Sequence, residues 1–155
     1  MFHLVERIRA DPKYFPVSVD EIDRELRASG HFDCFGDYEC PDEDGTIVST
    51  RLRLNVTASV KHIVAWKIAI KMHETRIDGI DHEEWITRED GTRGPGGWHR
   101  HAWDPRARNA DRRKVLLPGF DKGVWSVKMF LVKSFRELRI EVNKHDDGLQ
   151  QLQFD

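Results

Sequence analysis

Two histidines in the segment at residues 98–103 (WHRHAW) carry the clearest chemical potential in this chain. Side chains alternate across a strand, so His99 and His101 share one face and Arg100 points to the other. An imidazole titrates near neutral pH and serves as an acid, a base or a metal ligand. The pattern therefore predicts a small polar site on one face of a strand.

Three uses of this pair remain open. In the first, His99 and His101 act as base and acid in metal-independent cleavage of an RNA phosphodiester, and Arg106 or Arg108 stabilises the developing phosphorane charge. In the second, both histidines and Glu84 ligate a divalent metal ion, as in sites of two histidines and one carboxylate. In the third, the histidines are polar strand positions without chemistry. Only the second use needs a cofactor.

A basic segment follows the histidine pair. Residues 91–118 carry seven cations against two carboxylates, whereas the whole chain has a net charge of −2. Such a segment attracts polyanions, and a tryptophan beside it can stack on bases. A solvated, arginine-rich loop without a ligand is the alternative. The residues predicted to contact nucleic acid are Arg93, Arg100, Trp103, Arg112, Arg113 and Lys114.

Composition sets the broad class of the protein. With 155 residues, 39% hydrophobic and 34% charged, the chain is expected to form one domain in the cytoplasm, with no membrane partner. Cys34 and Cys40 are expected to be reduced thiols. The spacing His31-x2-Cys34-x5-Cys40 lacks the second ligand pair of a zinc knuckle. The nucleotide-binding and serine-hydrolase motifs are absent, which argues against those mechanisms. The sequence carries no signal for the oligomeric state.

The elements that position the histidines are predicted from hydrophobic spacing. The fold class is α+β, an antiparallel meander of about four strands packed by a C-terminal helix, with an N-terminal helical segment. Residues 1–30 form that segment, with a short first helix and a second over 19–29 that begins at the capping pattern Ser18 to Glu21 and stops at Gly30. Residues 31–45 read as an acidic loop, 46–143 as the sheet and helix core, and 144–155 as a tail.

Within the core, strict alternation predicts strands over 46–58 and 64–72, joined as a hairpin. A third strand is expected within 75–87, bulged around Gly79. Residues 90–97 (DGTRGPGG) are expected to form a turn, and 98–103 to return as a fourth strand facing His82 and Glu84. Apolar residues from Val124 to Val142 recur at helical spacing and predict the covering helix. A strand over Val124 to Val132 is the competing interpretation, because Trp125, Val127 and Met129 also alternate.

One family resemblance follows from this order of features. Alternating strands, a glycine-rich turn, the cluster His99-Arg100-His101 and a C-terminal helix resemble small prokaryotic toxin-type proteins such as the TumE family, over residues 46–143. The Asp-Asn and consecutive-histidine signature of that family is absent here. The resemblance implies an antitoxin partner and an activity directed at nucleic acid, with His99 and His101 as the important residues.

These observations predict a small cytoplasmic protein that acts on or binds nucleic acid as a histidine-dependent RNase of toxin type. The alternative function is a non-catalytic interaction module, whose basic loop binds an acidic protein partner or nucleic acid by charge.

Overall fold

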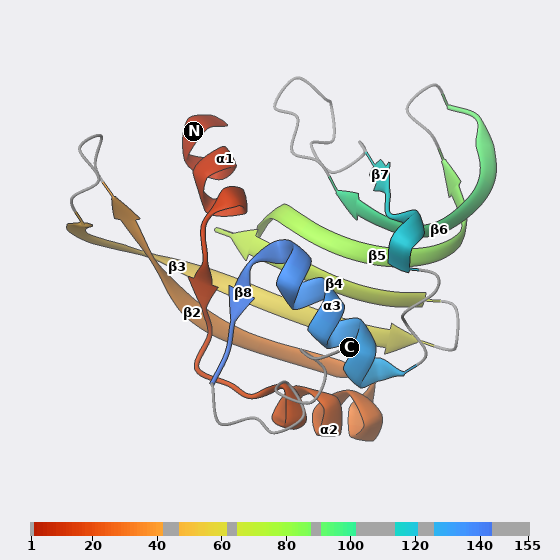
Figure 1. The fold of residues 1–155 in the computed structure, drawn as a ribbon, viewed down its shortest axis with the longest axis horizontal. Helices are drawn as coiled ribbons and strands as arrows, with labels where there is room; N and C mark the ends of the chain where they lie inside the picture. The colour runs from red at the N-terminus through yellow and green to blue at the C-terminus, as the bar shows by residue number, and fades with distance from the viewer. Residues whose placement is uncertain are drawn as a thin grey trace.

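The computed structural model describes residues 2–41, 47–61, 65–87, 91–101, 114–120 and 126–143. In these ranges the chain folds into helices and one curled, mainly antiparallel sheet, which confirms the α+β class (Figure 1). The helices are α1 (Phe2–Ala10), α2 (Val19–Ser29) and α3 (Val127–Leu138), with a 3-10 turn η1 (Pro118–Phe120). The strands are β1 (Lys13–Tyr14), β2 (His31–Pro41), β3 (Ile47–Lys61), β4 (Ala65–Met72), β5 (Thr75–Thr87), β6 (Arg93–His101), β7 (Lys114–Leu116) and β8 (Ile140–Glu141).

The sheet has the order β7-β6-β5-β4-β3-β2-β1-β8. Strands β2 to β7 form the predicted antiparallel meander, whereas β1 pairs with β8 in parallel. The described residues thus form eight strands, and the predicted number of about four was too low. The strands missed are β1, β2, β7 and β8, three of which have only two or three residues and carry no detectable period.

Helix α2 forms where its local signals place it. The Ser18 hydroxyl accepts a hydrogen bond from the Glu21 backbone amide at 3.1 Å, and Gly30 ends the helix with φ +76°. A side chain is disfavoured in that left-handed conformation, which is why glycine stands there. The predicted boundaries of 19–29 are confirmed.

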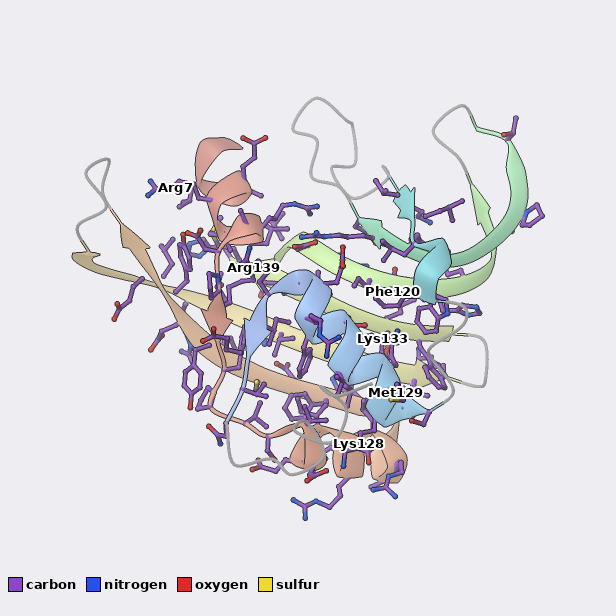
Figure 2. The ribbon with its side chains drawn as sticks, viewed as in Figure 1. Arg7, Phe120, Lys128, Met129, Lys133 and Arg139 are labelled. Atoms are coloured by element: carbon purple, nitrogen blue, oxygen red, sulfur yellow. The ribbon has the colours of Figure 1, made fainter. Side chains whose placement is uncertain are left out.

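Helix α3 lies across one face of the sheet (Figure 1). Ser126 caps its N-terminus, and its buried side chains, Phe130 among them, pack against Trp66 and Trp98 with ring centroids 5.6 and 5.2 Å apart. Lys128 extends from α3 toward α2 (Figure 2). Its ammonium pairs with Asp20 of α2. The predicted C-terminal helix is confirmed, although it ends at Leu138 and the chain continues as β8.

Residues 31–41 form strand β2, so the prediction of a loop was wrong. The segment contains acidic and turn-forming residues, so its hydrophobicity does not alternate clearly along the sequence. In the structure its side chains alternate in exposure: from Phe32 to Tyr38 the inward ones are half-buried or buried, and the outward ones are exposed. Pairing with β3 over the length of the strand compensates for its weak strand propensity.

Residues 93–97 also form strand, as the first half of β6, so the prediction of a turn over 90–97 was wrong in this part. Strand pairing is made through backbone amides and carbonyls, which glycine supplies as well as any residue. The hairpin register runs from Thr87 opposite Arg93 to Ile80 opposite Arg100. This register decides which residue of β5 faces the histidines.

Strand β5 contains an irregularity close to the predicted bulge at Gly79. Ile70 of β4 pairs with Asp78 and Lys71 pairs with Arg76, which leaves Ile77 as an extra residue. No helix among the described residues is both long and apolar enough to cross a membrane.

Candidate metal centre

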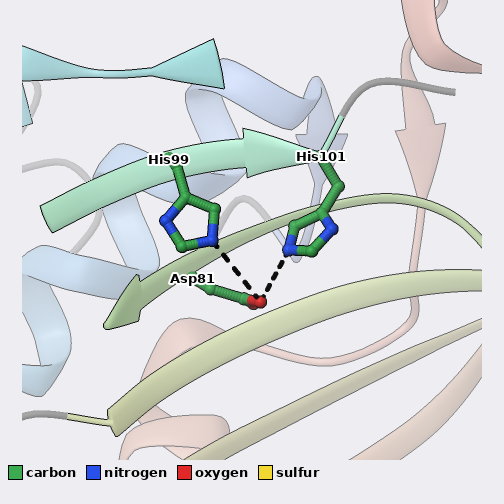
Figure 3. Close-up of side chains that lie close together, drawn as sticks. All are labelled: Asp81, His99 and His101. Atoms are coloured by element: carbon green, nitrogen blue, oxygen red, sulfur yellow. Dashed lines mark hydrogen bonds and ion pairs between the residues drawn. The ribbon is translucent and has the colours of Figure 1, made fainter. Parts of the chain in front are cut away.

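Strands β5 and β6 bring one carboxylate and both predicted histidines together on one face of the sheet (Figure 3). Asp81 is the register partner of His99. The Nε2 atom of His101 lies 2.7 Å from Asp81 Oδ2, and the Nε2 atom of His99 lies 3.9 Å from the same oxygen. All three residues are buried, and one ligand atom from each lies within 4.8 Å of the others.

His99 presents a lone pair with no partner. Its ring is 0% exposed, and its Nδ1 lies 3.1 Å from the Gly97 carbonyl oxygen. A carbonyl only accepts hydrogen bonds, so Nδ1 carries the proton and Nε2 of the neutral ring does not. Burial lowers the pKa of His99, which keeps the ring neutral. Nε2 is thus a buried acceptor without a hydrogen-bond partner in the structure.

Asp81 is held as an anion. Burial raises its pKa, but hydrogen bonds from His101 and Arg76 outweigh burial and bring the pKa well below its ordinary value. The Arg76 guanidinium donates through Nη2 to Oδ1 at 2.8 Å and through Nη1 to Oδ2 at 3.2 Å. This two-point contact fixes the plane of the carboxylate and directs Oδ2 toward the histidines.

Gly79 makes the Arg76 contact possible. A Cβ atom at this position would lie 2.2 Å from Arg76 Nη2 and 2.6 Å from the Ile68 carbonyl oxygen. The guanidinium therefore occupies the space that a side chain would fill, and it passes over Gly79 along the strand to reach Asp81. The glycine serves the site by its lack of a side chain.

The distances in this group suit a metal ion. A tetrahedral ion with ligand bonds of about 2.0–2.1 Å places its ligand atoms about 3.3 Å apart. The two separations from Asp81 Oδ2, 2.7 and 3.9 Å, lie on either side of that value. A metal-ligating histidine usually donates its other ring N–H to a carbonyl or carboxylate, which is the arrangement of His99 and Gly97.

No family model, curated protein or solved structure matches this chain. The resemblance to the TumE family therefore stays a prediction, and the function has to be inferred from the site itself.

The opposite face of β5 carries a second buried carboxylate, Asp78. Arg100 donates to it through Nε at 3.0 Å and through Nη2 at 2.8 Å, and Arg9 of α1 lies 3.0 Å from Oδ1. Alternation had placed Arg100 on the face away from the histidines, and it lies there, engaged with Asp78. Arg9 also donates to the His101 carbonyl oxygen at 2.7 Å, which ties α1 to β6.

Of the other predicted site residues that the structure describes, Lys114 of β7 lies beside the histidines as the register partner of His101. Arg93 is exposed at the first position of β6, away from them. Glu84 lies in β5, with its side chain outside the described part. The register puts Asp81, and not Glu84, opposite His99, so Asp81 replaces Glu84 in the ligand set. The following predicted residues lie outside the described ranges: Trp103, Arg106, Arg108, Arg112 and Arg113.

Two further sequence hypotheses concern His82 and the cysteines. His82 pairs with Trp98 and packs against its ring at 4.7 Å between centroids, away from the histidine pair. Cys34 is a half-buried free thiol, and burial raises its pKa to about 11, which makes the thiolate ligand harder to form. The side chain of Cys40 is outside the described part.

Sequence reasoning missed Asp81 because the hairpin turn was placed several residues too late. The pairing of Thr87 with Arg93 continues the hairpin to Asp81 opposite His99, whereas a predicted turn over 90–97 moves the facing residues toward Glu84. An aspartate on a strand is itself a signal, since this residue is depleted in strands unless it has a partner. Asp78 and Asp81, both on β5, carry that signal.

Proposed function

We propose that this protein binds a divalent transition-metal ion through Asp81, His99 and His101. The observation that carries the proposal is the buried Nε2 of His99, which has no hydrogen-bond partner and shares its site with a second imidazole and a carboxylate. An unsatisfied buried acceptor costs about 1–3 kcal/mol. Coordination of a cation would remove that cost.

The donor set favours particular ions. Two imidazole nitrogens and one carboxylate oxygen suit Zn²⁺, Fe²⁺, Co²⁺ or Ni²⁺, whereas Ca²⁺ and Mg²⁺ prefer oxygen ligands throughout. His99 would bind the ion through its unprotonated Nε2, so this residue releases no proton on binding. His101 donates from Nε2 to Asp81, so it would transfer that proton to Nδ1 or to solvent on binding the ion. Three protein ligands leave coordination positions open, as in catalytic metal sites.

The test is metal binding by purified, chelator-treated protein. Equilibrium dialysis against Zn²⁺ should give one ion per chain, and Co²⁺ should give visible absorption bands of low-symmetry coordination. His99→Ala should weaken binding at least about 100-fold, because changes to groups that only support a ligand already cost about 10–100-fold.

The matched control is His73→Asn. His73 is exposed in a turn with φ 51°, a conformation that asparagine tolerates. His99→Gln keeps most of the volume and provides a second variant if His99→Ala does not fold. Binding by His99→Gln as tight as by the wild-type chain would refute the site. A wild-type melting temperature that does not rise with Zn²⁺ would also count against it.

A second candidate is the metal-independent, histidine-dependent cleavage of RNA. The chain of contacts from Arg76 through Asp81 to His101 favours it, because a carboxylate that orients an imidazole is a recurring arrangement in acid–base catalysis. RNA should then be cut equally with and without chelator, and a His99→Ala/His101→Ala protein should be inactive. Equal cleavage by that protein and the wild-type chain would exclude this candidate.

The alternative function is a non-catalytic interaction module. It predicts binding to nucleic acid or an acidic protein that weakens steeply with salt and is not changed by the histidine substitutions. Salt titrations of wild-type and His99→Ala/His101→Ala proteins separate it from both candidates above.

A further inference from the structure

The charges of the candidate metal centre leave a bound cation uncompensated. The Asp81 carboxylate already pairs with the Arg76 guanidinium, so the two formal charges cancel. The His99 ring adds no negative charge, and it is fully buried with its Nδ1 on the Gly97 carbonyl oxygen. A divalent ion here would keep its two positive charges in a buried position, which is costly without an anion. An anionic ligand from solvent would compensate them.

Two lysines stand beside the centre on the same face of the sheet. Lys114 is the cross-strand partner of His101, and Lys67 is the cross-strand partner of Asp81. Residues directly opposite each other in an antiparallel pair have Cβ atoms about 4.5–5.5 Å apart. Lys114 is also partly buried, with a side chain 19% exposed, so it lies against the centre.

These lysines are only partly neutralised within the described residues. Glu83 is shared between them, with its Oε1 3.6 Å from Lys67 Nζ and its Oε2 3.4 Å from Lys114 Nζ. One carboxylate at such distances cannot offset two ammonium groups. The side chains of Lys114 and Lys67 are 19% and 48% exposed, so the cationic side of the centre faces solvent.

We propose that the metal centre takes a phosphate group as its exchangeable ligand, with one oxygen on the ion and another on the Lys114 ammonium. The proposal rests on the metal site proposed above. A phosphate carries several charged oxygens and can span the two positions, whereas a monatomic anion such as chloride fills only one. Lysine binds phosphate as a point charge and needs no planar geometry to do so.

The experiment titrates inorganic phosphate into Co²⁺-loaded and metal-free protein at constant ionic strength set with chloride. Calorimetry and the Co²⁺ absorption bands report the binding. Phosphate should bind the loaded protein and shift the bands. Lys114→Ala should weaken phosphate binding about tenfold, the usual scale for a hydrogen bond to a charged group. It should not weaken Co²⁺ binding measured without phosphate, because the change removes a positive charge beside the ion. Lys61→Ala removes an exposed lysine at the C-terminal end of β3, which β4 separates from β5, and should change neither affinity.

The outcomes separate this inference from the proposed function. Co²⁺ binding without any response to phosphate overturns the phosphate ligand and leaves the metal site standing. Equal phosphate binding by metal-free protein, or by Lys114→Ala, also overturns it. Absence of Co²⁺ binding overturns both. A short RNA oligonucleotide without terminal phosphates shows which kind of molecule supplies the phosphate group. If the oligonucleotide competes with inorganic phosphate, the ligand is a phosphodiester. If it does not compete, the ligand is a phosphomonoester or free phosphate.

Discussion

Replacing Arg76 with methionine should destabilise the fold by about 3 kcal/mol, because a buried carboxylate that loses its cation costs about 3–5 kcal/mol and His101 retains part of the interaction. The Asp81 side chain is 1% exposed and the Arg76 side chain 17%. Methionine keeps most of the arginine stem volume, so the loss reports the charge, the two hydrogen bonds to Asp81 and the weaker one to the Ile68 carbonyl oxygen at 3.4 Å.

Urea denaturation in the presence of a chelator measures this loss without a contribution from metal. The matched control is Arg27→Met, which breaks another arginine–aspartate pair, with Asp23 at 2.9 Å. Arg27 is 65% exposed and the pair is of the i,i+4 type on a helix, so its loss should cost only about 0.3–0.5 kcal/mol.

The pH dependence gives an independent check. The folded-state pKa of Asp81 is depressed, so its stabilising contribution is complete above the ordinary value of 3.8 and is lost as the pH falls toward the folded-state pKa. In Arg76→Met the carboxyl pKa rises, and protonation relieves the unpaired charge. The stability difference between wild type and variant should thus shrink in acid. A loss at pH 7 no larger than that of Arg27→Met would refute the assigned role of Arg76.

Three further substitutions test other parts of the structure. Gly79→Ala should displace the Arg76 guanidinium, because the new methyl group would lie 2.2 Å from Arg76 Nη2. Co²⁺ titration should then show weaker binding than by the wild-type protein. Unchanged binding would contradict the packing of Arg76 over Gly79. Burial lowers the pKa of Lys13 from 10.5 to about 8, so the penalty for its charge is present below pH 8 and disappears as the pH rises to 10.5. Wild type should therefore gain stability relative to Lys13→Met over that range in urea melts, and parallel curves would exclude a shifted lysine. Ser18→Ala should lower the free energy of unfolding by about 1 kcal/mol in the same assay, because the N-cap of α2 is lost. An unchanged stability would contradict a stabilising role for this cap.

The elements that the sequence predicts well are those specified locally. Helix α2 is bounded by Ser18 and Gly30, whose side-chain and backbone properties act within one turn. Strands β3, β4 and β5 show alternation that depends on one exposed and one buried face. Strand β2 and the first half of β6 carry turn-forming residues, and partner strands override their weak propensity.

The candidate site was half predictable. Spacing alone placed His99 and His101 on one face, whereas the choice of Asp81 depended on a hairpin register that no local pattern fixes. Arg76 could not be found from the sequence, because its contact with Asp81 requires both the space over Gly79 and the irregular pairing near Ile77.

The extra residue Ile77 has a consequence for how charge is divided across the sheet. Arg76 and Asp81 are five positions apart, an odd interval that places residues on opposite faces of an uninterrupted strand. One additional backbone unit reverses this parity and brings them to the same face. Deletion of Ile77 would send Arg76 to the side of Asp78 and leave Asp81 without a guanidinium. The presence of Ile77 thus determines that Arg76 pairs with Asp81 on one face, while Arg100 pairs with Asp78 on the other.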